Sequence, residues 1–457
     1  MKKTMCVVAG VLALLVFGSS CGISTGKKGK DFTEVTVWSA DSHSKNEMDK
    51  LVREFNDTTG KQEGIKLVYE VKENDIAQQI DLALSTGAAP DIFPLGSIKK
   101  SADNKYIEPI EKMPGGKEFL KRYEGNLVEG WHLNEGVAYT VPLTTTTVGL
   151  IYNKDMFKQA NIVDENGEAK PPQTIAEMVE DAKILTNVAE KRFGIIIPMK
   201  WSSWFDCDVA AVVMPSVGHQ GYDTRTGTYD YSGYKQLLEA ILQIKKDGSL
   251  YPGAEGIDND PARARFAEGN IGMKIGYSWD VGVLNTQFPA KCDWGVAPLP
   301  TYSTQERYLQ PYRPGWAPCI NSESVANKDP EKIMTVYKWI CGDEVARDLY
   351  KSGLNMPWDY NIIADLDPSE CELKGWAEFA DLLKISTNMV IGKSKNMDGK
   401  TTLADMFMNS VWNGDMTVDE ALEKATKDAN EAVAKYLEIN PNYDGSIRVD
   451  PDYNIKR

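Results

Sequence analysis

Histidine is scarce in this sequence of 457 residues, and its cysteines lack the spacings that bind metals. Only His43, His132 and His219 occur, too far apart for an HExxH pair, and none of the seven cysteines belongs to a CxxC motif. The common zinc signatures are therefore missing. We expect neither a metal nor a cofactor to support the function.

Positive charge is also in short supply. Lys and Arg number 51 against 66 Asp and Glu, which gives a formal net charge of −15. Such a surface repels a phosphate backbone, and this argues against nucleic acid as a partner. Beyond the N-terminal segment, no apolar run approaches the roughly 20 residues that a membrane-spanning helix needs. The length allows two or three globular domains.

The N-terminal segment has the features of an exported protein. Two lysines precede an apolar run over residues 5–17, which is typical of a secretory signal peptide, here residues 1–20. The small residues before Cys21 resemble a bacterial lipobox, in which Cys21 would be lipidated. Gly18 departs from that motif, which usually has an aliphatic residue at this position. The alternative is an ordinary signal peptide with an incidental cysteine.

Lipidation would make residues 21–30 a polar, Gly-rich tether between the membrane and a folded body. Stable anchoring needs two acyl chains, and palmitate on the lipidated cysteine would satisfy this requirement. The predicted location is extracytoplasmic, with the protein anchored by lipid to the outer face of the cell membrane.

Five cysteines would remain in the mature chain, an odd number whose pairing the sequence leaves open. We expect most of them to be small buried hydrophobes. They are Cys207, Cys292, Cys319, Cys341 and Cys371.

Strand and helix signals alternate from Asp31 onward. Residues 35–38 alternate like a strand, and Met48, Leu51, Val52 and Phe55 then form the stripe of an amphipathic helix. A second strand over residues 65–71 and a helix over 75–85 continue the pattern. This βαβα order indicates an α/β fold.

Helix caps punctuate the rest of the chain. Thr174 with Glu177 predicts a capping box, and Thr417 with Glu420 predicts another. Asp329 before a proline predicts a further helix start. The stretch FGIIIPM at residues 193–199 reads as a buried strand.

Tryptophan, unlike histidine, is abundant, with eleven residues. Trp38, Trp201, Trp204 and Trp279 each follow a predicted strand. Ligands in open α/β sheets bind beyond the carboxyl ends of strands, so these aromatics predict a binding cleft. A second set stands in helical or strand contexts and is expected in the core: Trp131, Trp294, Trp339, Trp376 and Trp412.

The order of several segments resembles family 1 of the extracellular solute-binding proteins of ABC importers, which includes the maltose-binding protein. These segments are EVTVWSA, LALSTGAAPDIFPL, YTVPLTTTTVGLIYNKDMFKQANI, PPQTIAEM, FAEGNIGMKIGYSWD with DWGVAPLP, and DPEKIMTVYKWICGDEVARDLY before GLNMP. No single segment is diagnostic, but together they span nearly the whole mature chain.

The resemblance implies a two-lobe periplasmic-binding-protein-like fold with a ligand cleft between the lobes and a hinge of several crossings. Lobe one is expected at 31–143 plus 280–325, and lobe two at 144–279 plus 326–457. Crossings are expected at residues 142–148, 277–281 and 322–329. The four threonines at 144–147 would stiffen the first crossing. A monomer is expected.

The resemblance also implies ligand contacts. Trp279 and Asp280 resemble the position of a tryptophan that stacks on sugar, because aromatic faces suit sugar C–H faces. One of Trp201 and Trp204 is expected as a second platform and the other as part of the core. Which is which stays open.

Polar candidates come from three further loops. Asp41 and His43 follow Trp38 in a loop that resembles a sugar-binding stretch, although capping of the next helix is an equal alternative for Asp41. Asp91 matches the family's PD aspartate, with a structural turn as the alternative.

The remaining candidates depend most on the resemblance. Arg313 and Trp316 stand where the family often has a Gly-rich turn that lines the cleft. Thr146 replaces an acidic ligand contact of the maltose-binding protein, which argues against malto-oligosaccharide specificity. Trp358 is a further candidate with no decided role.

The function that these features predict is a sugar-binding receptor, for an oligosaccharide ligand, that closes its lobes and delivers the ligand to the membrane permease of an ABC transporter. One alternative is the same fold with a peptide or polyamine ligand. Others are a secreted glycosidase or polysaccharide lyase and a surface adhesin. Residues 392–394 imitate the end of a P-loop and are set aside, and residues 440–451 favour a calcium loop only weakly.

Overall fold

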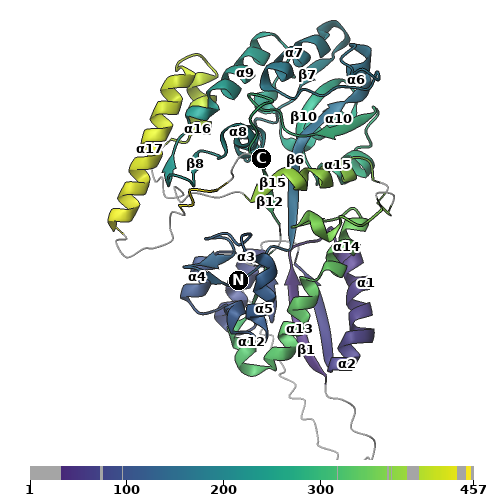
Figure 1. Cartoon of the computed structure of the whole chain (residues 1–457), viewed down its shortest axis with the longest axis vertical. Coiled ribbons are helices and arrows are strands. Elements are labelled where there is room, and N and C mark those ends of the chain that lie inside the picture. The colour runs from purple at the N-terminus through teal and green to yellow at the C-terminus, as the bar shows by residue number, and fades with distance from the viewer. Residues whose placement is uncertain are drawn as a thin grey trace, which may run out of the picture.

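The computed structural model describes residues 32–72, 76–94, 96–315, 317–367, 370–371, 373–388, 401–439 and 449–453. Figure 1 shows two α/β lobes stacked along the long axis of the molecule, with strand β6 rising from the junction into the upper lobe. The predicted fold class is confirmed. The signal peptide, Cys21 and the tether lie outside the described residues.

Lobe one, the lower lobe in Figure 1, is built on a four-stranded sheet in the order β13-β3-β1-β2. Strands β2 and β3 run parallel to β1, and β13 is antiparallel to β3. Its strands are β1 (Thr33–Ser39), β2 (Ile65–Val71), β3 (Ile92–Pro94) and β13 (Pro318–Ile320), beside the hairpin β4 (Leu133–Asn134) and β5 (Val137–Ala138). Its helices are α1 (Lys45–Phe55), α2 (Lys61–Glu63), α3 (Ile76–Thr86), α4 (Ile98–Asp103), α5 (Gly116–Leu120), α12 (Ser322–Asn327), α13 (Pro330–Ile340) and α14 (Asp343–Lys351).

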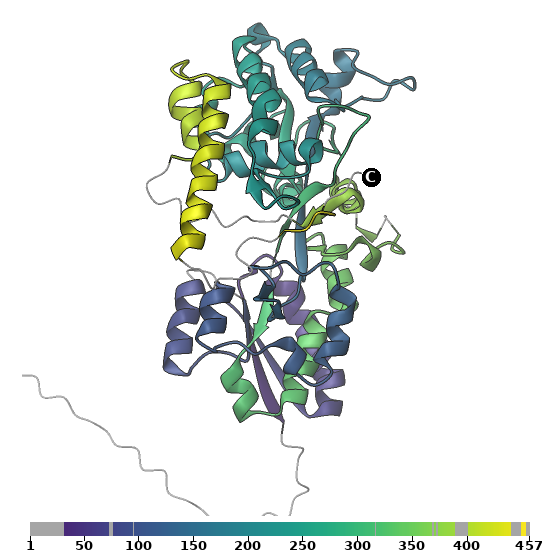
Figure 2. The same cartoon turned by 60° about the vertical axis from the view of Figure 1, so that its left-hand side comes forward.

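Lobe two is built on a sheet in the order β15-β12-β6-β10-β7, with β11 and β14 also paired to β6. The helix α17 runs along one side of this lobe (Figures 1 and 2). The strands are β6 (Thr144–Asn153), β7 (Phe193–Ile195), β10 (Ile271–Tyr277), β11 (Trp294–Ala297), β12 (Gln310–Pro314), β14 (Met356–Pro357) and β15 (Ser386–Asn388), with the hairpin β8 (Tyr222–Asp223) and β9 (Thr228–Tyr229). The helices are α6 (Lys154–Gln159), α7 (Ile175–Leu185), α8 (Ala211–Val217), α9 (Lys235–Lys246), α10 (Asn259–Ala267), α11 (Asp280–Gly282), α15 (Trp376–Asp381), α16 (Leu403–Met406) and α17 (Val418–Ile439).

Local sequence signals placed several of these elements correctly. The predicted apolar stripe of α1 is its buried face. The capping box of Thr174 and Glu177 begins α7, and Asp329 caps α13 through its side chain. Thr417 and Glu420 exchange hydrogen bonds immediately before α17. Among the described residues, no helix combines the length and apolarity that crossing a membrane requires.

The predicted division of the chain needs correction at two places. Residues 280–314 were assigned to lobe one, but after β10 the chain turns back and adds β11 and β12 to β6, in the sheet of lobe two. Residues after 325 were assigned to lobe two, but α13 packs on lobe one, where Tyr337 Oη donates to the Pro318 carbonyl at 3.0 Å. Strand pairing between distant segments decides both assignments.

The lobes are joined where three chain segments run side by side. β6 begins at Thr144, and Thr145 lies between Pro314 of β12 and Met356 of β14 in the sheet. The Gly315 amide donates to the Thr144 carbonyl at 2.8 Å. The chain therefore crosses at the start of β6, between β12 and β13, and between α14 and β14. The first of these is the predicted first crossing, and the other two replace the crossings predicted at 277–281 and 322–329.

Candidate functional site

Two tryptophans lie beyond the carboxyl ends of neighbouring strands of lobe two. Trp201 follows β7, and Trp279 follows β10, whose last residue Tyr277 pairs with Val148 near the hinge end of β6. This register places Trp279 on the side of lobe two that faces lobe one. Trp279 is 38% exposed, although a side chain of this size is usually covered.

Two neighbouring side chains hold the Trp279 ring in place. It stacks on Tyr277 with ring centroids 4.7 Å apart and planes inclined by 24°, and the Arg313 guanidinium lies 5.8 Å from its centroid. Arg313 Nη1 in turn lies 2.8 Å from Cys207 Sγ. The ring is thus partly exposed and is held in a fixed orientation by Tyr277 and Arg313.

A pocket of about 520 Å³ opens beside this ring, a volume in the range of small-molecule sites. We call it the tryptophan pocket. All its lining residues belong to lobe two, so only one wall of an interlobe site is assembled. They are Trp201, Asp258, Asn259, Asp260, Pro261, Arg263 and Trp279.

Asp280, the predicted partner of Trp279, is only 1% exposed. Its Oδ1 accepts from Arg263 Nε at 2.6 Å and lies 2.6 Å from Arg263 Nη2, and its Oδ2 accepts from the Tyr277 amide at 3.2 Å. Lys274 Nζ lies 3.5 Å from the same oxygen. The oxygens of Asp280 are therefore already bonded within the protein. Arg263, which Asp280 holds in place, is the residue of this pair that lines the pocket.

Behind this pair lies a further buried carboxyl group. Asp208 is on a π-helical turn, Phe205–Ala210, and its Oδ1 is buried without a hydrogen-bond partner among the described residues. Burial raises the pKa of Asp208 to about 7, the Lys274 ammonium lowers it, and the Asp280 carboxylate raises it further. The pocket therefore rests on a buried network of alternating charges.

The structure distinguishes the two tryptophans that the sequence could not. Trp201 is half-buried and lines the pocket, whereas Trp204 is 6% exposed and packs against Phe205 and Phe407 at centroid distances of 5.3 and 6.2 Å. Trp204 belongs to the core of lobe two.

The predicted aspartates of lobe one are engaged in local networks. Asp91 is 1% exposed, and its Oδ2 accepts from the Thr36 amide at 2.7 Å and from Lys328 Nζ at 2.8 Å. Asp41 accepts from Ser44 Oγ at 2.6 Å and from Asn355 Nδ2 at 2.7 Å. The contacts of Asp41 fit the alternative of a helix start, whereas Asp91 joins distant segments through Thr36 and Lys328 and does not form the local turn that was its alternative.

The other predicted residues are dispersed. His43 is exposed, and Trp38 is half-buried under Lys72, whose Nζ lies 4.3 Å from the ring centroid. Trp358 is 7% exposed and contacts Tyr123 at a centroid distance of 5.0 Å, in the core.

Thr146 pairs with Arg313 across β6 and β12, and both side chains are half-buried. Of these two residues, Arg313 contacts the Trp279 ring. Trp316 lies outside the described residues.

Sequence reasoning missed the α10 side of the pocket. The stretch DNDPARARF supplies these residues, which are Asp258, Asn259, Asp260 and Arg263. Asp258 followed by an early proline was a usable signal for the start of a helix here. Trp131 was also misjudged: it was predicted in the core but is 36% exposed.

The sequence left the pairing of the five cysteines open and offered no zinc signature. The five cysteines there are free thiols, three of them buried. Within the described ranges, no group of three or more His, Cys, Asp or Glu side chains has the geometry of a metal site. The segments that imitate a P-loop and a calcium loop lie mostly outside the described residues.

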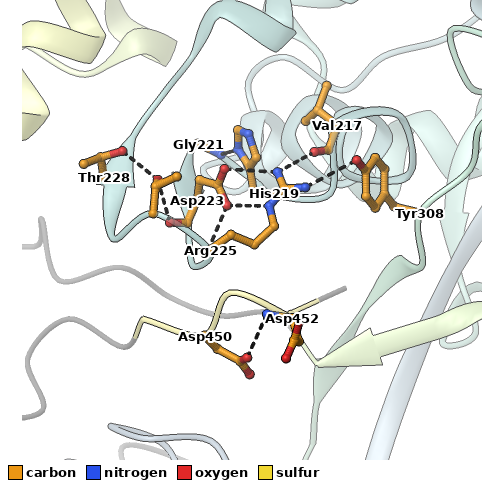
Figure 3. Close-up of polar contacts among 10 residues, drawn as sticks. Val217, His219, Gly221, Asp223, Arg225, Thr228, Tyr308, Asp450 and Asp452 are labelled. Carbon is orange, nitrogen blue, oxygen red and sulfur yellow. Dashed lines mark hydrogen bonds and ion pairs between the residues drawn. The ribbon is translucent and has the colours of Figure 1, made fainter. Parts of the chain in front are cut away.

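A second polar cluster lies between β8 and the segment before β12 (Figure 3). Arg225 donates from Nε and Nη2 to Asp223 at 2.8 and 3.0 Å, from Nη2 to the Val217 carbonyl at 3.1 Å and from Nη1 to Tyr308 Oη at 3.3 Å. Four of the five N–H donors of the guanidinium are thus used in joining these loops. The cluster is thus a structural clamp, and the tryptophan pocket remains the site best suited to a ligand.

Two lobes, a three-segment hinge and an aromatic pocket on one facing wall define a two-lobe ligand-binding protein. The family model described as bacterial extracellular solute-binding protein matches residues 41–346. The chain belongs to this family.

Similar proteins match about two thirds or more of the chain. The sn-glycerol-3-phosphate-binding periplasmic protein UgpB of Brucella abortus (strain 2308) is 22% identical over 448 residues, covering 94% of this chain and 98% of the relative. The UgpB of Agrobacterium fabrum is 24% identical over 66% of this chain and 67% of the relative.

Solved structures agree in fold. The sugar-binding protein MalE from Xanthomonas citri aligns with a TM-score of 0.66 at 18% identity, over 90% of this chain and 100% of that one. The cyclic α-maltosyl-1,6-maltose-binding protein from Arthrobacter globiformis gives 0.65 at 16% identity, over 88% and 100%.

Proposed function

We propose that this protein is an extracytoplasmic receptor that binds a sugar and delivers it to the permease of an ABC importer by closing its lobes. The tryptophan pocket carries the proposal. It combines an exposed, preorganised ring with polar groups and lies on the wall of lobe two that faces lobe one. Membership of the solute-binding family supports the receptor role.

The chemistry of the pocket suits a polyhydroxylated ligand. Sugar rings present apolar C–H faces, which pack on the flat faces of Trp201 and Trp279, and hydroxyl edges, which exchange hydrogen bonds with carboxylates and guanidinium groups. Asp258, Asp260 and Arg263 supply those groups along the same wall. Trp201 and Trp279 are the proposed ligand contacts, and Arg313 and Asp280 support them.

Closure follows from the position of the pocket on one lobe. A ligand that also touches lobe one binds the closed state better than the open state, and this difference in affinity shifts the population toward closure. The exposed His43, the half-buried Trp38 and the exposed Trp131 of lobe one are the side chains proposed to meet the ligand, whereas Asp41 and Asp91 are already bonded.

A thermal-shift screen over monosaccharides, oligosaccharides and polyols tests the function. A ligand that binds only the native state raises the melting temperature by mass action. At least one sugar should give a rise that grows with concentration. A rise with spermidine or a peptide and with no sugar would instead establish the non-sugar alternative, and loss of spermidine binding at high salt would identify the carboxylates as its site.

The receptor is proposed not to act as an enzyme. Incubation with the sugar that the screen identifies should return the sugar intact by mass spectrometry. Release of a shortened product would favour the glycoside-cleaving alternative.

The membrane anchor is a separate proposal that rests on Cys21 and the segment before it. In cells fed labelled palmitate, the wild-type protein should carry label in the membrane fraction and the Cys21→Ala variant should not. Equal release of both proteins into the medium would contradict lipidation and leave an ordinary signal peptide. The protein is proposed to act as a monomer, which light scattering checks.

A further inference from the structure

Arg263 is the cation among the residues that line the tryptophan pocket. Its side chain is 14% exposed and comes from the second turn of α10. Two other cations lie nearby without lining the pocket: Arg313, which contacts the Trp279 ring and Cys207, and the buried Lys274, whose Nζ lies 3.5 Å from Asp280 Oδ2. The charge state around Arg263 therefore decides which ligands this wall attracts.

Two carboxylates already neutralise Arg263. Nε and Nη2 face the buried Asp280 at 2.6 Å, and Nη1 donates to the exposed Asp260 at 2.6 Å. A guanidinium has five N–H donors, so the arginine can still donate to a neutral hydroxyl, but its positive charge is offset. Asp258, a third carboxylate, lines the pocket without contacting Arg263.

This inference rests on the proposed function and sharpens its ligand class. We infer that Arg263 determines specificity: held between Asp280 and Asp260, it donates hydrogen bonds to an uncharged hydroxyl-bearing ligand, and the site rejects phosphate esters. The relatives named UgpB are named for binding sn-glycerol 3-phosphate, a phosphate ester. Binding of phosphate esters and of neutral sugars can therefore be compared directly in this chain. Asp280 is a positioning residue, because it acts through the arginine.

Asp260 provides the sharpest test, because it is exposed and its removal frees one edge of Arg263. Asp260→Asn keeps the size of the side chain and removes its charge. Asp258→Asn is the matched control: it removes the same charge from the same pocket, it has no contact with Arg263, and asparagine is as good a helix cap as aspartate. Both variants should melt close to the wild type.

Isothermal titration with sn-glycerol 3-phosphate and with inorganic phosphate measures the result at low and high salt. The wild type should bind neither probe at micromolar concentration. Asp260→Asn should bind sn-glycerol 3-phosphate at least about tenfold more tightly than the wild type does, as a freed charge-assisted donor allows, and salt should reverse the gain. Asp258→Asn removes a charge without freeing a donor of Arg263, so its gain in affinity should be clearly smaller than that of Asp260→Asn.

Three outcomes would overturn the inference. They are tight binding of sn-glycerol 3-phosphate to the wild type, an equal gain in both asparagine variants, and no gain in Asp260→Asn. An equal gain would mean that bulk charge alone sets selectivity. The proposed function fails separately: if no sugar raises the melting temperature, the proposal of a sugar ligand is lost, while the phosphate titrations still decide the role of Arg263.

Discussion

At the scale of single residues, the pocket separates exposed side chains, which a ligand can reach, from buried side chains that hold them in place. Trp279 is exposed and stacked from one side, whereas its neighbour Asp280 is buried and bonded to Arg263. Adjacent positions in the sequence therefore have different roles. A motif match between families assigns a position, but burial decides which atoms a ligand can reach.

Trp279→Ala is expected to weaken sugar binding without disturbing the fold. Loss of the stacked ring should cost about 2 kcal/mol, roughly a thirtyfold rise in Kd, while the melting temperature stays near that of the wild type because the ring is 38% exposed. Calorimetry with the sugar found in the screen measures this. Trp204→Phe is the control, since that buried ring should affect stability and leave affinity unchanged. Unchanged affinity in Trp279→Ala would remove Trp279 from the site.

Asp208 should give the stability of lobe two a distinct pH dependence. Its folded pKa of about 7 lies above the usual value near 3.9, because burial disfavours the charged form. Between pH 4 and 7 the folded state therefore holds a proton that the unfolded state has released. The free energy of unfolding should fall as pH rises through this window and level off above it, by about 2–3 kcal/mol between pH 5 and 8.

Denaturant unfolding of wild type and Asp208→Asn at pH 5 and pH 8 isolates this contribution, because Asp181 and His132 also titrate abnormally and remain in both proteins. Asparagine cannot ionise, so the variant should gain stability relative to the wild type at the higher pH. A difference between the two proteins that is independent of pH would contradict the assignment.

The sequence predicted the residue types of the site better than their arrangement. Trp279 was predicted because it follows a strand, which is local information, and because its position resembles that of a sugar-stacking tryptophan in the family. The role of Asp280 depends on Arg263, which stands seventeen positions earlier in another helix. The choice between Trp201 and Trp204 depends on Phe407, which lies far away in the sequence. Contacts between distant segments carry no signal in one sequence.

At the scale of elements, caps and apolar stripes were predictable for the same reason. α7 and α13 begin where their cap residues stand, and the predicted apolar stripe of α1 is its buried face. The lobe assignment of β11 and β12 was not predictable, because an antiparallel strand that returns to its own sheet and a crossing to the other lobe look alike along the chain.

The close packing of Gly315 against Thr144 of the hinge strand β6 can be tested by substitution. A Cβ atom at this position would overlap Thr144 Oγ1 and lie 2.9 Å from the Thr144 carbonyl oxygen. Gly315→Ala should therefore push β12 away from β6 and lower the free energy of unfolding by about 1–3 kcal/mol, measured by chemical denaturation.

Gly282→Ala is the matched control for the hinge variant. Gly282 is helical, with φ of −60°, and an added Cβ would meet nothing within 4 Å, so alanine there should be neutral or slightly stabilising. If the two alanine variants had the same stability, close packing at the hinge would not be what requires glycine at position 315.

At the scale of the whole molecule, the mechanism of lobe closure depends on which lobes the ligand contacts. The tryptophan pocket is lined by lobe two alone, and the lobes are joined through the three segments at Thr144 and Thr145. A ligand that contacted only this wall would bind open and closed states equally and would move nothing, however tight the binding. Closure therefore requires that lobe one also contact the ligand.

Small-angle scattering with and without the sugar from the screen tests this requirement. The radius of gyration should fall on saturation of the wild type, because closure brings the lobes together. The Trp279→Ala variant, at a sugar concentration that saturates only the wild type, should keep the ligand-free value. Calorimetric binding to the wild type without any change in the radius of gyration would confine the ligand to lobe two, and the receptor would then need a signal other than closure to present its ligand to a permease.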